Sequence, residues 1–364
     1  MAVVVGATGH GAIPAGAAVG LEIFFVLSGY LTVRLLVAHE QVSLAHVARF
    51  VGRRARRVLP ALLTMLGGVS LLVLTARPDV LERLGPDIRA TLVGAGNWHL
   101  VRYTSASAPS FLEHLWALAV GAQLTLVVAV VLLVVRSRRG RAVLRLAGLV
   151  LAVGSAVALA MLSMTAAVPE RALYGTDTRA AGMLLGVVLG LSLRPPLEGG
   201  LPPPRARRLQ VLGLVAFVGL LAAMTFGGGA LVWLTRGGLL VVDVLAVIVI
   251  AVIVRGARLD GMLGAVGLRW IGVRSYALYL WHWPVLLALG GPATVRQPVV
   301  TAVYVVAVVV LADLTYRFVE IPLGGARHVP SNGTIGAPAI AVRTTAIACG
   351  SASAAALLTG PPQA

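Results

Sequence analysis

The stretch GLEIFFVLSGYLTVRLLV, residues 20–37, decides the fold class of this chain. It is almost wholly apolar and long enough to cross the hydrocarbon core of a bilayer as a helix, which takes about 20 such residues. Eight further runs share this character: 58–76, 114–136, 144–165, 180–194, 209–226, 230–254, 271–290 and 298–316. Because a helix in lipid satisfies its backbone polar groups internally, the runs predict an all-α, polytopic transmembrane bundle.

Two weaker segments extend this set. Residues 1–13 are apolar but too short to cross a membrane alone, and residues 341–358 form a weak last candidate. Counting them gives roughly nine to eleven helices, and we expect about ten. We expect one membrane domain over residues 1–325 and a Gly/Pro/Ala-rich tail with that last candidate helix over 326–364. Inside the domain, RPPLEGGLPPPRARR, residues 194–208, is a Pro-rich connecting loop.

The composition excludes several classes of protein. Of 364 residues, 59% are apolar and 12% are charged, whereas soluble domains carry about 25% charged residues. The net charge of +17 lies in short clusters between apolar runs, so no basic face of a soluble domain exists to bind nucleic acid. Cys349 is the single cysteine, which excludes an intrachain disulfide and a thiolate metal cluster. We expect the lipid bilayer as partner, with no nucleic acid and no metal.

Arginine clusters predict the orientation, because basic residues concentrate in cytoplasmic loops. With the N-terminus cytoplasmic and the first short segment counted as a span, every strong cluster falls in an inside loop. These clusters are Arg49, Arg53, Arg54, Arg56 and Arg57; Arg136, Arg138, Arg139 and Arg141; Arg205, Arg207 and Arg208; and Arg255, Arg258 and Arg269. The predicted outside loops are 77–113 and the loop that ends at Arg179. In each of them, acidic residues are as numerous as arginines.

Polar residues at membrane depth are costly, so they are candidates for a functional site. They are His10; Glu22 and Ser28; His114, Trp116 and Gln123 in FLEHLWALAVGAQL; and Tyr276, Tyr279 and His282 in SYALYLWHWP. Each has a structural alternative. Aromatic residues and histidines at a helix end often mark the membrane interface, and a serine in a membrane helix often bonds to a backbone carbonyl. Taken singly, none of these residues assigns a function.

Together the motifs resemble the acyltransferase type 3 family of bacterial membrane O-acyltransferases. The resemblance rests on GLEIFFVLSGYL (its GVDxFFVLSGFL helix), FVGRRARRVLPALL, Asn97-Trp98 followed by HLWALAV, YGTDTRAAGMLLG, GVRSYALYLWHWPVLL and FVEIPL. These stretches come in the family's order and cover residues 5 to 325. The resemblance implies a bacterial cell-membrane enzyme that moves an acyl group, commonly acetyl, from cytoplasmic acyl-CoA to a hydroxyl. The acceptor would be a cell-surface glycan, a glycolipid or a related molecule.

The resemblance also implies roles for residues. His10 stands where the family has its essential histidine, and a neutral imidazole can take a proton from a hydroxyl or accept the acyl group. Glu22 stands at the family's GVD acid. The arginines on the cytoplasmic side could hold the phosphates of CoA with their guanidinium groups: Arg53, Arg54, Arg56 and Arg57. Arg179, beside Asp177, could position an acceptor or a partner carboxylate. Substrate or structural support is expected from Ser28, His114, Trp116, Gln123, Tyr276, Tyr279 and His282. No permanently bound cofactor is expected, with acyl-CoA as the donor substrate.

Departures from the family pattern keep other interpretations open. Gly121 and Ala122 replace paired glutamates, and Glu22 replaces an aspartate. An arginine that the family carries before the histidine would fall upstream of Met1, so we expect an upstream start or a truncated gene product. Many relatives continue into an extracytoplasmic esterase-like domain, which would here be a separate partner. The alternatives are a degenerate homologue with little activity, or a transporter or channel. Transporters often have inverted repeats and paired broken helices, and we find neither in the sequence.

The predicted orientation can be tested with reporter fusions. Fusions at Gly140, Gly199 and Gly256 should report the cytoplasm, because each lies in a predicted inside loop. Fusions at Ser107 and Gly291 should report the outside. Alkaline phosphatase and a fluorescent protein, each active on one side only, make the measurement. Two or more reversed sites would contradict the orientation derived from the arginine clusters.

Overall fold

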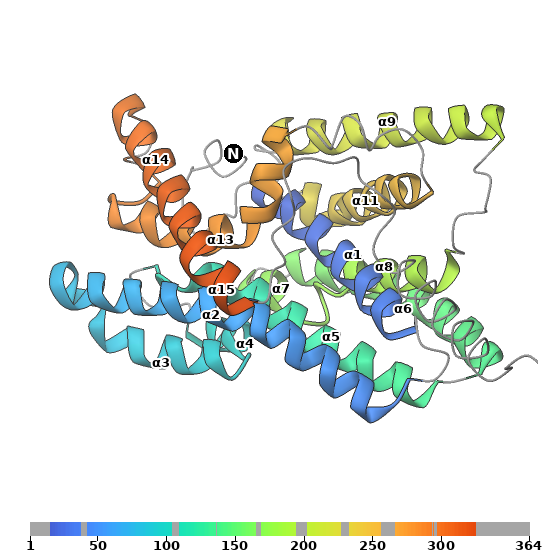
Figure 1. The fold of residues 1–364 in the computed structure, drawn as a ribbon, viewed down its shortest axis with the longest axis horizontal. Helices are drawn as coiled ribbons and strands as arrows, with labels where there is room; N and C mark the ends of the chain where they lie inside the picture. The colour runs from blue at the N-terminus through green and yellow to red at the C-terminus, as the bar shows by residue number, and fades with distance from the viewer. Residues whose placement is uncertain are drawn as a thin grey trace, which may run out of the picture. The chain divides into compact units, whose positions relative to one another are not determined.

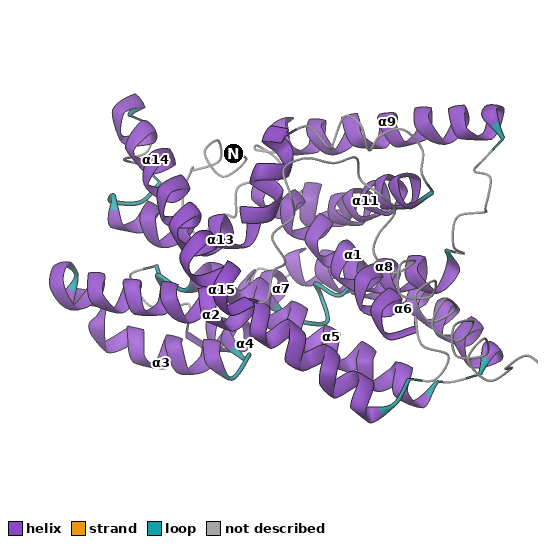
Figure 2. Ribbon diagram, in the orientation of Figure 1, coloured by secondary structure: helices purple, strands orange, loops and turns teal. Residues whose placement is uncertain are grey.

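The computed structural model describes residues 15–37, 42–103, 109–135, 137–164, 169–193, 202–226, 233–255, 266–292, 294 and 297–324. By contacts the chain divides into residues 1–326 and 327–364, and the description concerns the first unit. Every regular element in these ranges is a helix (Figure 2). The segments 1–13 and 341–358 lie outside the described residues, and the expected tail stays a prediction.

All nine predicted spans coincide with helices. The helices are α1 (Ala15–Val37), α2 (Leu44–Ala76), α5 (Trp116–Val134), α6 (Arg138–Met164), α8 (Ala181–Ser192), α9 (Pro203–Phe226), α11 (Leu239–Val254), α13 (Val266–Ala288) and α14 (Pro298–Thr315). Among the described residues, seven helical stretches are long and apolar enough to cross a membrane, and α8 is apolar but shorter. The all-α, polytopic fold is therefore confirmed.

Short elements connect these helices (Figure 1). They are η2 (Pro78–Val80), α3 (Leu81–Leu92), α4 (Gly96–Tyr103), η3 (Glu113–Leu115), α7 (Pro169–Tyr174), η5 (Leu234–Gly238), η7 (Tyr316–Glu320) and α15 (Ile321–Gly324). Four of the short elements, η2, α3, α4 and η3, follow α2 in the loop that the sequence predicts to be outside.

Helix α2 extends well before the apolar run that predicts it. Ser43 caps its first turn, with Oγ accepting a hydrogen bond from the His46 backbone N–H at 3.3 Å. The helix has 33 residues, which is about 50 Å at 1.5 Å per residue and exceeds a hydrocarbon core of about 30 Å. Its arginine-rich first part therefore continues the helix beyond the apolar layer.

Helix α1 is the most deeply packed of the long apolar helices, with 56% of its span buried. It packs against α8, α11, α5 and α9, and Val19, Phe25, Val26 and Val33 are fully buried along it. Leu27, Leu31 and Leu35 form an exposed stripe on its remaining side. Helix α1 therefore packs against other helices on most of its surface and presents one apolar stripe outward.

Glycines let α1 and α8 approach backbone to backbone. A Cβ added at Gly186 would collide with the Val26 carbonyl oxygen, and one added at Gly29 would collide with the Met183 carbonyl oxygen. Gly182, Gly186 and Gly190 recur every four residues along α8, the small-residue spacing that favours close helix pairs in membranes. This spacing fixes how α8 lies on α1.

The helical stretch that ends with α11 is broken close to its start. Within η5, Arg236 and Gly237 leave helical backbone angles, and Gly237 has φ = +121°, which favours glycine. Irregular backbone inside a membrane is tolerated where it is buried in protein or lines a cavity. The break makes this helix different from its uninterrupted neighbours.

The close α1–α8 contact predicts that one added methyl group on α8 lowers the stability of the protein. Gly186→Ala should destabilise the protein by about 1–3 kcal/mol, the usual cost of overpacking, because the added Cβ meets backbone that cannot rotate away. Gly154→Ala on α6 is the matched control, since a Cβ there meets nothing within 4 Å. Thermal unfolding in detergent gives the comparison, and equal midpoints for both variants would show that the contact is looser than described.

Candidate active site

A buried ion pair joins the first full span to the turn before α8. An Nη atom of Arg179 lies 2.6 Å from a carboxylate oxygen of Glu22, and the two residues are 3% and 2% exposed. The guanidinium also lies 5.2 Å from the centre of the Trp116 ring, a distance at which a cation is attracted to an aromatic face. The structure thus brings together Glu22, Trp116 and Arg179, three residues that the sequence analysis named separately.

Asp243 on α11 joins this pair, and the sequence analysis missed it. Its side chain is fully buried and contacts the Glu22 carboxyl group. Gly182 makes the space, because a Cβ there would lie 2.5 Å from Asp243 Oδ1 and 3.0 Å from Glu22 Oε2. The signal was present in the sequence as a lone acid in the apolar run LLVVDVLAVIVI, residues 239–250.

A small cavity adjoins the three charged groups. Its polar lining is Glu22, Thr178, Arg179, Thr235 and Asp243, and the broken segment contributes Gly237. The cavity has a volume of about 10 Å³, which is room for about one water molecule. A buried polar space of this size can hold water or a proton.

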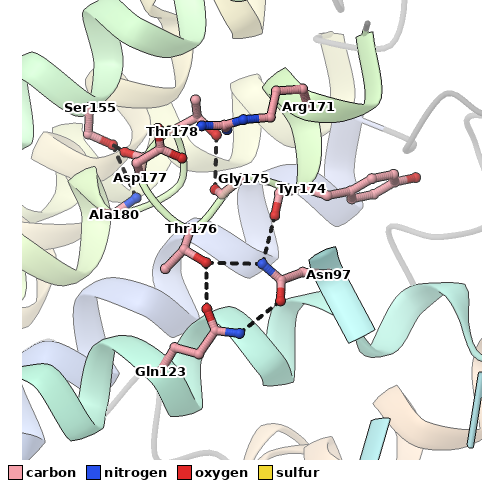
Figure 3. Close-up of polar contacts among 10 residues, drawn as sticks. All are labelled: Asn97, Gln123, Ser155, Arg171, Tyr174, Gly175, Thr176, Asp177, Thr178 and Ala180. Carbon is pink, nitrogen blue, oxygen red and sulfur yellow. Dashed lines mark hydrogen bonds and ion pairs between the residues drawn. The ribbon is translucent and has the colours of Figure 1, made fainter. Parts of the chain in front are cut away.

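A cycle of hydrogen bonds holds the turn that carries Arg179 (Figure 3). Gln123 on α5 accepts from the Thr176 hydroxyl at 2.5 Å and donates to the Asn97 side-chain oxygen at 2.9 Å. Asn97 in turn donates to the Thr176 hydroxyl and to the Tyr174 carbonyl, each at 3.0 Å. Gln123, which the sequence predicted as a support residue, therefore holds this turn in place. Asn97 and Thr176 take part in the same support, although the sequence did not predict them to do so.

Asp177 stabilises the opposite side of the same turn. Its carboxylate accepts a hydrogen bond from Arg171 at 2.7 Å, which holds the pKa of Asp177 below its ordinary value. Ser155 on α6 donates to the Asp177 carbonyl at 2.5 Å and accepts from the Ala180 backbone N–H at 3.1 Å. Asp177 thus pairs with Arg171 on the surface, while Arg179 points inward to Glu22.

The histidine and tyrosine motifs form a second cluster, between η3 and α13. The ring centres of His114 and His282 lie 5.2 Å apart, and His114 Nε2 donates to the Leu280 carbonyl at 3.1 Å. The Tyr279 hydroxyl donates to the His114 carbonyl, and the Tyr276 hydroxyl donates to the Val58 carbonyl at 3.0 Å. These bonds tie α13 to α2 and η3, so the observed contacts support helix packing.

The predicted CoA-binding arginines separate into two groups. Arg54 is partly buried and donates to the Ser28 hydroxyl at 3.4 Å, which connects α2 to α1. Arg53, Arg56 and Arg57 are exposed. At spacings of three and four residues, these three share one helix face, so they form the arginine surface available to a phosphate.

Two further predictions concern residues near α1. His10 lies outside the described residues, so its catalytic role stays a prediction. Gly121 is buried, and a Cβ there would contact the Phe24 ring at 3.5 Å. Ala122 is exposed. Gly121 and Ala122 therefore face different surroundings.

Comparison with known proteins identifies the family of the chain. The acyltransferase domain family matches residues 3–317. The chain belongs to this family. It is 33% identical over 322 residues to the peptidoglycan O-acetyltransferase OatA of Listeria monocytogenes, covering 85% of this chain and 51% of that protein. It is 27% identical over 320 residues to the O-acetyltransferase OatA of Staphylococcus aureus, covering 85% of this chain and 53% of that protein.

The chain spans about half the length of these curated relatives. No solved structure matches it. Family membership and the apolar helices together make the chain a multi-pass bacterial membrane protein. In this chain, the buried Glu22–Arg179 pair connects two of the stretches that resemble the family, GLEIFFVLSGYL and YGTDTRAAGMLLG.

The buried pair predicts a large stability difference between two arginines. Arg179→Gln should cost about 3–5 kcal/mol, because removing one partner of a buried pair leaves an uncompensated charge. Arg77→Gln is the control, since Arg77 pairs with Asp79 on the surface, where ion pairs contribute little. Denaturation in detergent measures both variants. If Arg179→Gln unfolded at the wild-type midpoint, the pair would have to be solvated.

Proposed function

We propose that this chain transfers an acetyl group from acetyl-CoA to a hydroxyl of a peptidoglycan-type glycan. The observation that carries the proposal is the family match over residues 3–317, with its motifs joined by a buried Glu22–Arg179 pair. Two relatives of similar sequence are named as O-acetyltransferases, one of them for peptidoglycan. No cofactor needs to stay bound, because acyl-CoA is consumed as a substrate.

The proposed reaction exchanges a thioester for an ester. The acceptor oxygen bonds to the acyl carbon, the carbon–sulfur bond to CoA breaks, and the hydroxyl proton ends on the CoA thiol. We assign proton abstraction, or transient acyl bonding, to His10, whose imidazole suits either step near neutral pH. We assign the CoA phosphates to the exposed face of Arg53, Arg56 and Arg57, because guanidinium groups pair well with phosphate. An extracytoplasmic esterase-like domain is the proposed partner on the acceptor side.

One observation favours a second candidate, a degenerate homologue. A Cβ at Gly121 would contact the Phe24 ring and Ala122 is exposed, and neither residue supplies the carboxylate that the family pattern has there. A carboxylate beside an imidazole favours its protonated form and can orient it. A chain without one can keep the fold and lose rate. A folded wild type that is inert with every donor and acceptor supplied would favour this candidate.

The first functional test concerns His10. Membranes that contain the protein should release CoA from labelled acetyl-CoA and label a peptidoglycan-type acceptor. His10→Ala should lower this rate by about 10²–10⁴-fold, the usual contribution of general acid–base catalysis, without changing the amount of inserted protein. Retention of full activity by the variant would remove His10 from the mechanism.

The second test concerns the donor. Arg53→Gln combined with Arg56→Gln should raise the KM for acetyl-CoA about tenfold or more, because amides cannot form charge-assisted bonds to phosphate. Arg138→Gln with Arg139→Gln is the matched control, since these arginines are also exposed and lie in another predicted inside loop. An equal change in both pairs would indicate a general effect of surface charge, and no change would leave Arg53 and Arg56 as topological anchors.

A further inference from the structure

The buried centre contains one acidic group more than its arginine can neutralise. Glu22 and Arg179 balance each other at 2.6 Å. Among the described residues, the charged groups that face Asp243 from neighbouring elements are Glu22 on α1 and Arg179 before α8. An ionised Asp243 would therefore be a net buried charge, which is far more costly than a buried neutral group.

The contacts of Asp243 point the same way. Neither of its carboxyl oxygens accepts a hydrogen bond from a donor in the described part of the chain, although the residue is fully buried. Its side chain contacts the Glu22 carboxyl group, and both carboxyl groups lie against Gly182. Two ionised carboxylates in contact repel, whereas one proton turns the contact into a hydrogen bond, because a protonated carboxyl is a donor.

The cavity gives this proton a route for exchange. Besides the charged groups, the Thr178 and Thr235 side chains and the broken backbone at Gly237 line a space for about one water molecule. A water molecule there would be close to Asp243 and to the two threonines. Arg236, which is part of the break, is exposed and does not line the cavity.

We propose that Glu22 and Asp243 share one proton beside Arg179, and that this carboxyl pair exchanges protons through the cavity during acyl transfer. The proposal rests on the proposed function.

The pair supplies its proton toward the departing CoA thiolate as the carbon–sulfur bond breaks. It regains a proton, the one that His10 takes from the acceptor hydroxyl, as the new carbon–oxygen bond forms. One proton leaves the pair and one returns in each turnover, so the protein is unchanged at the end. Asp243 acts through water and does not touch the substrate, so it is a positioning residue for the proton.

Infrared spectroscopy of the purified full chain tests the shared proton without any assay of activity. The wild type should show the carbonyl stretch of a protonated carboxylic acid, and this band should be absent from Asp243→Asn and unchanged in Asp79→Asn, an exposed acid. Labelling the wild type with carbon-13 aspartate should shift the band, which tests the same point if the variant does not fold. No such band, or a band indifferent to both changes, would overturn the proposal.

A bound sodium ion is the competing way to balance the charge. Exchanging sodium for choline should leave the thermal midpoint of the wild type unchanged if a proton occupies the site. A midpoint that falls on sodium removal, and does not do so in Asp243→Asn, would assign the site to a metal cation and overturn the proton.

Kinetics test the role of the exchange. Asn copies the shape of a protonated aspartic acid, so Asp243→Asn should keep the wild-type midpoint and KM for acetyl-CoA. It should nevertheless lower kcat at least tenfold, and Asp79→Asn should change none of these. A wild-type kcat in Asp243→Asn would leave the shared proton structural and overturn its part in the transfer. An inert wild type that still shows the infrared band would contradict the proposed function while upholding the proton.

Discussion

The described structure depends on keeping one cation, Arg179, out of both water and lipid. Desolvating a guanidinium is costly, and a carboxylate at close range recovers the cost only when the geometry is good. Glu22 provides that carboxylate from α1, and Trp116 covers the guanidinium with an aromatic face. The surrounding features serve this geometry. The α8 glycines bring its backbone against α1, and the hydrogen-bonded turn of Thr176 and Asp177 directs the arginine inward.

The helices could be predicted from the sequence because lipid leaves few alternatives. A run of about 20 apolar residues has to form a helix to satisfy its backbone, and all nine runs did so. Their ends were less predictable. Hydropathy excludes the arginines of α2, yet Ser43 caps a helix that continues through them. The break at Gly237 was also not predicted, since a glycine in an apolar run is common in membrane helices.

Most residues of the site could be predicted from the sequence, but the contacts between them could not. Glu22, Trp116 and Arg179 were each singled out, but only the fold shows that residues so distant in sequence meet. Asp177 was expected to act beside Arg179, but it bonds to Arg171 while Arg179 pairs with Glu22. Asp243 escaped attention because it belongs to no quoted motif. Tyr276 and Tyr279 looked like site residues, and their hydroxyls bond to backbone carbonyls of other segments.

The burial of Glu22 on α1 has a consequence for how the protein is made. Synthesis runs from the N-terminus, so α1 reaches the membrane long before Arg179 leaves the ribosome. During that interval the carboxyl group of Glu22 has no guanidinium beside it, and an ionised acid inside a bilayer is expensive. The segment has to wait as a neutral acid, or remain within the insertion machinery, until α8 arrives. Assembly of this protein is therefore ordered in time, with the first full span completed by a residue made near the middle of the chain.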